Sequence, residues 1–283
     1  MNSLTYALVT PCYAPDRDRC SMLVESIERW VAPHVKHYLI IDRRDAELFK
    51  PFISSRTAML TVEDVLPPWL FRLPGIPKVW FSLRSLPVRN WILQQIVKLS
   101  IASVVSEDVL LCTDSDVFFI SGFEPRELER DGKVPLFVET GLRGKIPNND
   151  RWHQSAAELL GLPAEATFDT NYIGNVIPWR RQNVLELQRR LESRAAKPWQ
   201  QALAAKLAFA EYVLYGMFAQ NVLREASGHW NDPAVRTLCY WGTSPLDQEA
   251  LEKLKSKRQP HHHTVMISAK SRTPVESIRR VFC

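Results

Sequence analysis

Short apolar segments alternate with helical patterns through the first third of the chain, and this alternation limits the fold more than any other feature. Apolar runs at 4–10, 37–42, 58–62 and 109–113 each have the length of a buried strand. Between the first two runs, the apolar residues of segment 20–31 fall on one face of a helix. Such alternation is typical of an α/β fold, so we expect a mixed, mainly parallel sheet flanked by helices.

The rest of the chain offers no point at which it could be divided. Segment 67–87 holds five prolines and predicts a long irregular loop, and the polar segment 141–150 predicts a loop that moves over a site. No linker is rich enough in glycine, proline or serine to separate two units, so we expect a single domain that spans 1–283. We further expect helices at 45–53, 90–105, 180–194, 199–226 and 246–257, and strands at 136–139, 171–177, 235–241 and 264–268.

The composition excludes several classes of protein. Of the 283 residues, 46% are hydrophobic and 24% are charged, which excludes disordered and collagen-like chains. The net charge of +5 fits an anionic small ligand and a peripheral contact with an acidic membrane, but it is too small to predict nucleic acid binding. Five scattered cysteines without a CxxC pair predict free thiols in a reducing compartment. Without a signal-peptide pattern or an apolar run of about 18 residues, we expect a cytoplasmic protein.

Two aspartates follow the apolar run at 109–113. Asp114 and Asp116 are separated by Ser115, and they would stand at the carboxyl end of a parallel strand, where α/β folds bind ligands. Two carboxylates this close repel each other unless a cation lies beside them. Mg²⁺ and Mn²⁺ bind oxygen ligands and leave positions for phosphate oxygens. We interpret the pair as a metal site that faces a diphosphate, although a polar turn after a strand has the same composition.

The helix expected at 90–105 is apolar on most of its surface, but Trp91, Gln95 and Lys98 share one face. A buried lysine needs an anionic partner, because an unpaired charge is costly in an apolar environment. A diphosphate would serve as that partner. The alternatives are a nearby carboxylate or an ammonium group that reaches solvent.

Two later segments carry groups that could take part in chemistry. Glu211 lies among apolar and aromatic residues, where a carboxylate can act as a base or a hydrogen-bond acceptor; an exposed position at the rim of that face has the same pattern. His261, His262 and His263 precede the strand expected at 264–268, and one ring nitrogen could bind a metal. A solvated loop is the alternative, and we favour His263 as the ligand because it would begin the strand.

Together these residues resemble the GT-A glycosyltransferases, in particular a bacterial family of small glycosyltransferase-like proteins. In that family, the first strand ends in Thr-Pro-x-Tyr with an aspartate soon after, and a helix bears Trp, Gln-Gln and Lys. A later strand ends in Asp-Ser-Asp, and a Glu-Tyr pair lies in a helix beyond it. The residues that match are Thr10, Pro11, Tyr13 and Asp16, then Trp91, Gln94, Gln95 and Lys98, then Asp114, Ser115 and Asp116, and finally Glu211, Tyr212, Tyr215 and Gly216.

The resemblance implies a GT-A (Rossmann-like) fold and a metal-dependent transfer of sugar from a nucleotide-sugar donor to a hydroxyl acceptor. The acceptor would be a saccharide, a lipid-linked molecule or a small molecule, and the cofactor Mn²⁺ or Mg²⁺. Residues 1–120 would form the nucleotide-binding half and residues 121–283 the acceptor-binding half. The implied donor contacts are Thr10, Pro11, Tyr13, Asp16, Asp42, Gln95, Lys98, Asp114 and Ser115; the metal ligands are Asp114, Asp116 and His263; and the acceptor or sugar contacts are Asn171, Tyr172, Asn175 and Tyr212. Glu211 is the catalytic base if the reaction inverts the anomeric configuration; if it retains the configuration, Glu211 would instead stabilise the oxocarbenium-like centre or hold the acceptor.

Two other classes of protein stay open at this point. A haloacid-dehalogenase-like phosphatase also has Asp-x-Asp after an apolar strand, with the first aspartate as nucleophile. Its motif lies near the N-terminus with Thr or Val two residues after the second aspartate, whereas here the motif begins at Asp114 and Phe118 occupies that place. A non-catalytic protein that binds nucleotide sugars or glycans is the second alternative, and the intact aspartate pair argues against it.

Overall fold

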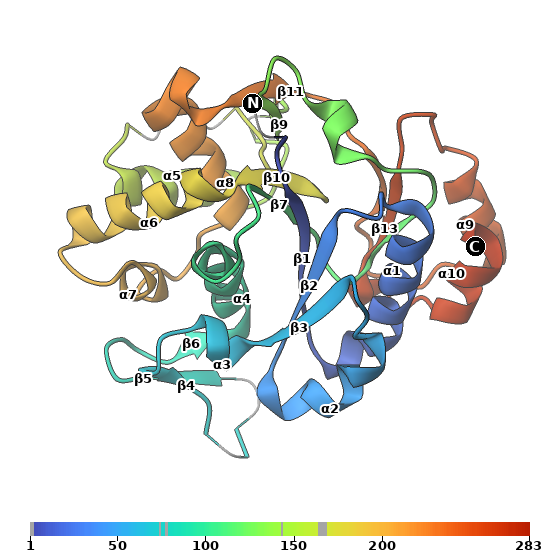
Figure 1. Ribbon diagram of the computed structural model, residues 1–283, viewed down its shortest axis with the longest axis horizontal. Coiled ribbons are helices and arrows are strands. Elements are labelled where there is room, and N and C mark those ends of the chain that lie inside the picture. The colour runs from blue at the N-terminus through green and yellow to red at the C-terminus, as the bar shows by residue number, and fades with distance from the viewer. Residues whose placement is uncertain (1–2, 74, 77–78, 143, 164–168) are drawn as a thin grey trace.

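The computed structural model describes residues 3–283 apart from 74, 77–78, 143 and 164–168. Its central sheet has the strand order β10-β7-β1-β2-β3 (Figure 1). Strands β1 (Tyr6–Cys12), β2 (Lys36–Ile41), β3 (Thr57–Thr61) and β7 (Val109–Cys112) are parallel, and β10 (Ile177–Arg180) pairs antiparallel to β7. The fold is therefore a mixed, mainly parallel sheet flanked by helices, as the sequence predicts.

Alternate side chains of the sheet are buried under different helices. On one face, Leu8 and Leu111 share a core cluster with Leu23 of α1 (Arg17–Trp30). On the other face, Val9 shares a larger cluster with α4 (Asn90–Ser100). Figure 1 shows α4 to α8 on one side of the sheet and α1, α9 and α10 on the other. The remaining α-helices are α2 (Ala46–Phe49), α3 (Val62–Val65), α5 (Asn149–Leu160), α6 (Arg181–Ala195), α7 (Trp199–Ala204), α8 (Glu211–Met217), α9 (Gln248–Lys255) and α10 (Val275–Phe282).

Smaller sheets extend the central one. Strands β12 and β13 are parallel, and β13 pairs antiparallel to β8, while β11 pairs with β9. The segment expected to be an irregular loop carries β4 and β5, which pair antiparallel, and β5 pairs in turn with β6. The bounds are β4 (Leu70–Phe71), β5 (Val79–Ser82), β6 (Val88–Arg89), β8 (Val117–Phe119), β9 (Val134–Phe137), β11 (His229–Asp232), β12 (Thr237–Tyr240) and β13 (Thr264–Ile267).

Two expected elements differ from the structure. The strand predicted at 171–177 is wrong. Asn171 pairs only in an isolated bridge to Glu139, and Ile177 already belongs to β10, where it pairs with Cys112. Between them, Val176 has a positive φ of 56° that turns the chain before β10 begins. The helix predicted at 199–226 is broken between α7 and α8, because Ala210 is extended (φ −120°, ψ 127°). This break makes Glu211 the first residue of α8.

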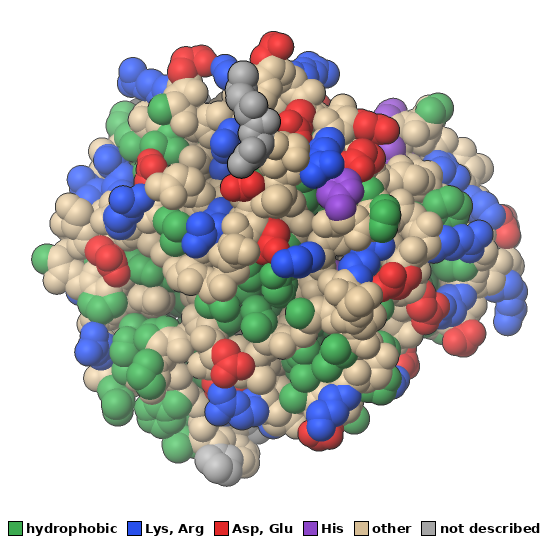
Figure 2. All heavy atoms as spheres, in the orientation of Figure 1, with side chains coloured by type: hydrophobic (Ala, Val, Ile, Leu, Met, Phe, Trp, Pro, Cys, Tyr) green, Lys and Arg blue, Asp and Glu red, His purple; other side chains and the backbone are tan. Residues whose placement is uncertain are grey.

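The surface seen in Figure 2 carries charged side chains of both signs, spread among apolar ones. Among the described residues, no helix is long and apolar enough to cross a bilayer.

A buried histidine links the three parallel strands β1, β2 and β3. The two ring nitrogens of His37 lie 3.1 Å from the Thr10 hydroxyl and 3.2 Å from the Thr57 hydroxyl. Burial of the ring, with a smaller contribution from Arg56, lowers the pKa of His37 to about 3. The folded protein therefore keeps this imidazole neutral over a pH range in which the unfolded chain is protonated.

We expect the free energy of unfolding to fall as the pH is lowered from 6.5 towards 3, because only the unfolded state takes up a proton at His37 in that range. The loss amounts to about 4–5 kcal/mol at the acid limit. Urea unfolding at a series of pH values measures it. A His37→Gln variant should show a flatter pH dependence, whereas His261→Gln, at an exposed site, should match the wild type. A His37→Gln profile as steep as the wild-type profile would contradict this assignment.

Candidate active site

The carboxyl ends of β1, β2 and β7 open into a cleft with two adjoining compartments. The first has a volume of about 300 Å³ and is lined by Tyr13, Asp42 and Trp91; we call it the nucleoside-sized compartment. The second has a volume of about 1140 Å³ and is lined by Lys98, Trp91 and residues of α8; we call it the main compartment. Trp91 lines both, so a ligand longer than either compartment could occupy the two together.

Lys98 stands at the wall of the main compartment and joins two acidic side chains. Its Nζ lies 2.8 Å from Asp114 Oδ1 and 2.9 Å from Glu211 Oε1, and it donates to the Tyr212 hydroxyl at 3.4 Å. The side chain of Lys98 is only 4% exposed. Although burial alone would lower the pKa of Lys98, the carboxylates of Asp114 and then Glu211 raise it well above its ordinary value. Of the alternatives for Lys98, the structure shows the lysine paired with carboxylates.

Glu211 is held in place by a glutamine of the neighbouring helix. The Gln95 side-chain oxygen accepts a hydrogen bond from the Glu211 backbone N–H at 3.0 Å, and its Nε2 donates to the Trp91 carbonyl at 3.2 Å. Gln95 is buried, and both ends of its amide are engaged within the protein. Gln95 also lines the main compartment, so its predicted contact with the donor stays a prediction, and its hydrogen bonds give it a second role in positioning Glu211.

The two aspartates after β7 lie in a group with an excess of negative charge. Asp116 Oδ2 accepts from the Ala269 backbone N–H at 2.9 Å, and the Ser115 hydroxyl donates to Asp16 at 3.5 Å. Burial, and next the charge of Asp114, raises the pKa of Asp116 to about 6. Burial also raises the pKa of Asp16, which the positive charge of Arg19 partly offsets.

A divalent cation fits the chemistry of this donor set. Four carboxylates, on Asp16, Asp114, Asp116 and Glu211, interact with the cations Lys98 and Arg19, which leaves two negative charges in excess within the group. Oxygen ligands of this kind suit Mg²⁺ or Mn²⁺. Among the described residues no three His, Cys, Asp or Glu side chains are grouped to hold a metal. Asp114 and Asp116 would therefore supply two ligands, and solvent or substrate the others.

His263 does not join the aspartates, so its predicted role as the third ligand is corrected. In the antiparallel pairing of β13 with β8, Thr264 is opposite Phe119 and Met266 is opposite Val117. His263 therefore lies at the far end of β13 from Asp116. Its Nδ1 donates to the Gly122 carbonyl at 2.9 Å. The adjacent His262 is also engaged, since its Nδ1 accepts from the Gln259 backbone N–H.

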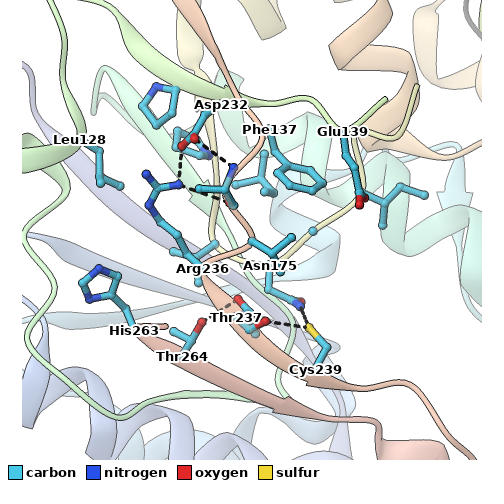
Figure 3. Close-up of a pocket in the computed structure, with 18 of the residues that line it drawn as sticks. Leu128, Phe137, Glu139, Asn175, Asp232, Arg236, Thr237, Cys239, His263 and Thr264 are labelled. Atoms are coloured by element: carbon cyan, nitrogen blue, oxygen red, sulfur yellow. Dashed lines mark hydrogen bonds and ion pairs between the residues drawn. The ribbon is translucent and has the colours of Figure 1, made fainter. Parts of the chain in front are cut away.

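His263 instead lines a second cavity of about 260 Å³, shown in Figure 3. There Arg236 forms an ion pair with Asp232, and the Asn175 amide donates to Cys239 Sγ at 3.6 Å. Asn171 lines both this cavity and the main compartment, so the two spaces adjoin.

The other predicted residues divide between the cleft and the core. Pro11, Tyr13 and Asp42 line the nucleoside-sized compartment, and Tyr212 and Asn171 line the main one. Two predicted contacts are wrong because their side chains are buried elsewhere: Thr10 bonds His37 inside the sheet, and Tyr172 packs in the core with its hydroxyl bonded to Gln220.

The sequence did not identify Arg72, which completes the nucleoside-sized compartment. Its Nη2 lies 2.7 Å from Asp42 Oδ2, and its guanidinium lies 4.9 Å from the centre of the Trp80 ring. Arg72 lies in the proline-rich segment 67–87, for which the sequence predicts only a long irregular loop, and a single arginine there carries no pattern of its own. Trp241 is a second residue that the sequence did not identify. It is exposed and lines the main compartment.

The fold and the cleft define the class of protein: an α/β protein with a cleft at the carboxyl edge of its parallel strands, where α/β folds bind ligands. Residues 4–280 match the model of a family described as a family of unknown function (DUF6492). The chain belongs to that family.

Other comparisons concern the sequence and the fold. No curated protein matches the sequence. Among solved structures, the apo crystal structure of mouse xyloside xylosyltransferase 1 is similar, with 12% sequence identity and a TM-score of 0.49, covering 96% of this chain and 100% of that chain.

Proposed function

We propose that this protein is a metal-dependent glycosyltransferase that moves a sugar from a nucleotide-sugar donor to a hydroxyl acceptor. The observation that supports this most directly is the buried Lys98, held between Asp114 and Glu211 at the wall of the main compartment. Sugar transfer needs positive charge beside the leaving diphosphate and a base beside the acceptor hydroxyl. The Lys98 group places both kinds of residue on one cleft wall.

The donor would occupy both compartments of the cleft. Tyr13 and Trp91 present exposed aromatic faces on which a nucleoside base can stack, and Asp42 with Arg72 offers polar partners for the base or ribose. The diphosphate would then lie towards Asp114 and Asp116. A divalent metal held by these two aspartates would supply charge that stabilises the leaving diphosphate.

Residues of the chain itself would accept the proton and stabilise the developing charge. Glu211 would accept the proton of the acceptor hydroxyl at its free carboxylate oxygen, and Lys98 would stabilise the developing negative charge next to Asp114. Asn171 and Tyr212 line the main compartment on the side of the second half of the chain, where the acceptor would bind. In this proposal residues 1–120 bind the donor and residues 121–283 bind the acceptor.

Thermal unfolding with and without Mn²⁺, in the presence of uridine or guanosine diphosphate, tests the proposal. A diphosphate at a hundred times its Kd should stabilise the protein by about 2.7 kcal/mol, and we expect this only with the metal. Asp116→Asn should abolish the metal-dependent shift. The same variant should be more stable than the wild type at pH 7 without ligand, by about 2–3 kcal/mol, because it removes a carboxylate whose pKa the fold raises.

Asp64→Asn is the matched control. The Thr61 hydroxyl and backbone, together with Arg43, hold the pKa of Asp64 below its usual value. This variant should therefore lose stability and keep the full metal-dependent shift. An Asp116→Asn protein that retains that shift would overturn the site assignment. Release of phosphate from simple phosphoesters would favour a phosphatase.

A further inference from the structure

Three leucines are exposed beside the cleft, on two segments that lie against each other. Leu83 and Leu86, in the turn between β5 and β6, are 77% and 82% exposed, and Leu207, between α7 and α8, is 75% exposed. The segments are joined by hydrogen bonds, since Arg89 donates to the Leu207 carbonyl and Gln201 donates to the Arg84 carbonyl. Figure 2 shows hydrophobic side chains gathered at the lower left, over the region where Figure 1 places β5, β6 and their connecting turn. We call these three residues the leucine surface.

A basic pocket of about 320 Å³ adjoins the leucine surface. It is lined by Arg84, Arg89, Lys197 and Lys206 together with Leu86 and Leu207, and no aspartate or glutamate is among the described residues that line it. Lys206 pairs with Glu158 at 2.7 Å. The other three cations form no ion pair with a carboxylate within the described part of the chain. Exposed apolar side chains and uncompensated positive charge therefore occur together at this one place.

We propose that the leucine surface and its basic pocket dock this protein on an anionic phospholipid bilayer. Leucine side chains at the tips of loops can enter the boundary between headgroups and acyl chains, and arginine and lysine beside them are attracted to anionic headgroups. A second copy of the chain is a poorer occupant. A two-fold contact through this surface would bring the four cations close to the same four cations of the other copy.

The docking surface is continuous with the mouth of the cleft. Arg89 and Leu207 line both the basic pocket and the main compartment. The docked protein would therefore open its cleft at the bilayer surface. Combined with the proposed function, this geometry selects a lipid-linked molecule as the acceptor. Docking itself does not depend on the proposed function, so the two can fail separately.

Flotation with phosphatidylcholine vesicles, with and without phosphatidylglycerol, tests the docking. We expect the wild type to float only with the anionic vesicles. Arg84→Ala with Lys197→Ala should weaken binding about 25-fold, at about fivefold for each charge near the surface. Leu83→Ser with Leu86→Ser should weaken it about tenfold or more for each leucine lost from the apolar layer. Thermal unfolding without vesicles checks that each variant is folded.

Matched controls carry the same changes away from this surface. Lys253→Ala with Lys257→Ala removes two exposed charges on and next to α9, which Figure 1 shows on the opposite side of the molecule from β5. Leu48→Ser with Ile53→Ser removes two half-exposed apolar side chains. Both should float like the wild type. Absence of flotation, equal binding to neutral vesicles, or unchanged binding by the Leu83→Ser, Leu86→Ser variant would overturn the proposal. A wild-type protein that is a dimer in solution, with this double variant a monomer, would also overturn it.

Discussion

Glu211→Gln is expected to lower the rate of sugar transfer about 10²–10⁴-fold, the usual contribution of a positioned general base. The fold should persist, because glutamine keeps an oxygen that can accept from Lys98 and the backbone N–H of residue 211 still donates to Gln95. Nucleotide sugars that carry the nucleoside diphosphate identified by thermal unfolding provide the assay, with release of that diphosphate as the readout. The loss should appear in kcat, with the KM for the donor nearly unchanged.

The control for Glu211→Gln is a carboxylate with the same kind of partner outside the cleft. Glu225 lies 2.8 Å from Lys133 Nζ, and its side chain is 93% exposed. Glu225→Gln should leave the rate of transfer unaltered. A Glu211→Gln enzyme with the wild-type kcat would show that another group accepts the proton of the acceptor hydroxyl. That result would not contradict metal-dependent binding of the donor.

Lys98→Met should be the most destabilising single change in the cleft, lowering the free energy of unfolding by about 3–5 kcal/mol. The substitution removes a cation whose Nζ lies within 3 Å of both Asp114 and Glu211. It leaves these two acidic groups without that partner in a partly buried wall. Chemical unfolding at pH 7 measures the loss. Lys133→Met, which breaks the exposed pair with Glu225, should cost about 1 kcal/mol or less.

A combined variant separates charge from packing at this position. If Asp114→Asn and Glu211→Gln are added to Lys98→Met, the buried charges are gone, and much of the lost stability should return. Transfer activity should not return, because the proposed base is absent. A Lys98→Met protein as stable as the wild type would show that water already screens the charges of Asp114 and Glu211.

The sequence predicts the central sheet well because its strands are buried on both faces, and continuous apolar runs such as 109–113 have few alternative structures. It predicts the break after α7 poorly. Apolar residues continue at helical spacing through 199–226, so the pattern itself predicts no break. At the start of α8 the Gln95 side-chain oxygen, from α4, accepts a hydrogen bond from the Glu211 backbone N–H, and the sequence does not reveal such a tertiary contact.

Part of the site could be predicted from the sequence, and part could not. Asp114 and Lys98 were recognisable because charged groups stood out on apolar elements. Their mutual pairing was one open alternative, and only the three-dimensional structure selects it. The predicted role of His263 as a metal ligand is wrong because the pairing register of β13 with β8 decides which end of β13 lies near Asp116, and the sequence alone does not reveal that register. Arg72 was missed because its partner Asp42 is distant in sequence.

One ammonium group pairs with two carboxylates of the same cleft wall, and this has a thermodynamic consequence. Asp114 follows the strand β7, Glu211 begins the helix α8, and each competes for Lys98. A ligand that withdraws Asp114 from the lysine leaves the full charge to Glu211, and a ligand that engages Glu211 has the converse effect. A ligand bound at Asp114 would thus alter the affinity for a ligand at Glu211, and the reverse effect would have the same factor, as linkage requires. Coupled binding of two ligands would then arise from a single shared counter-ion, without any movement of domains.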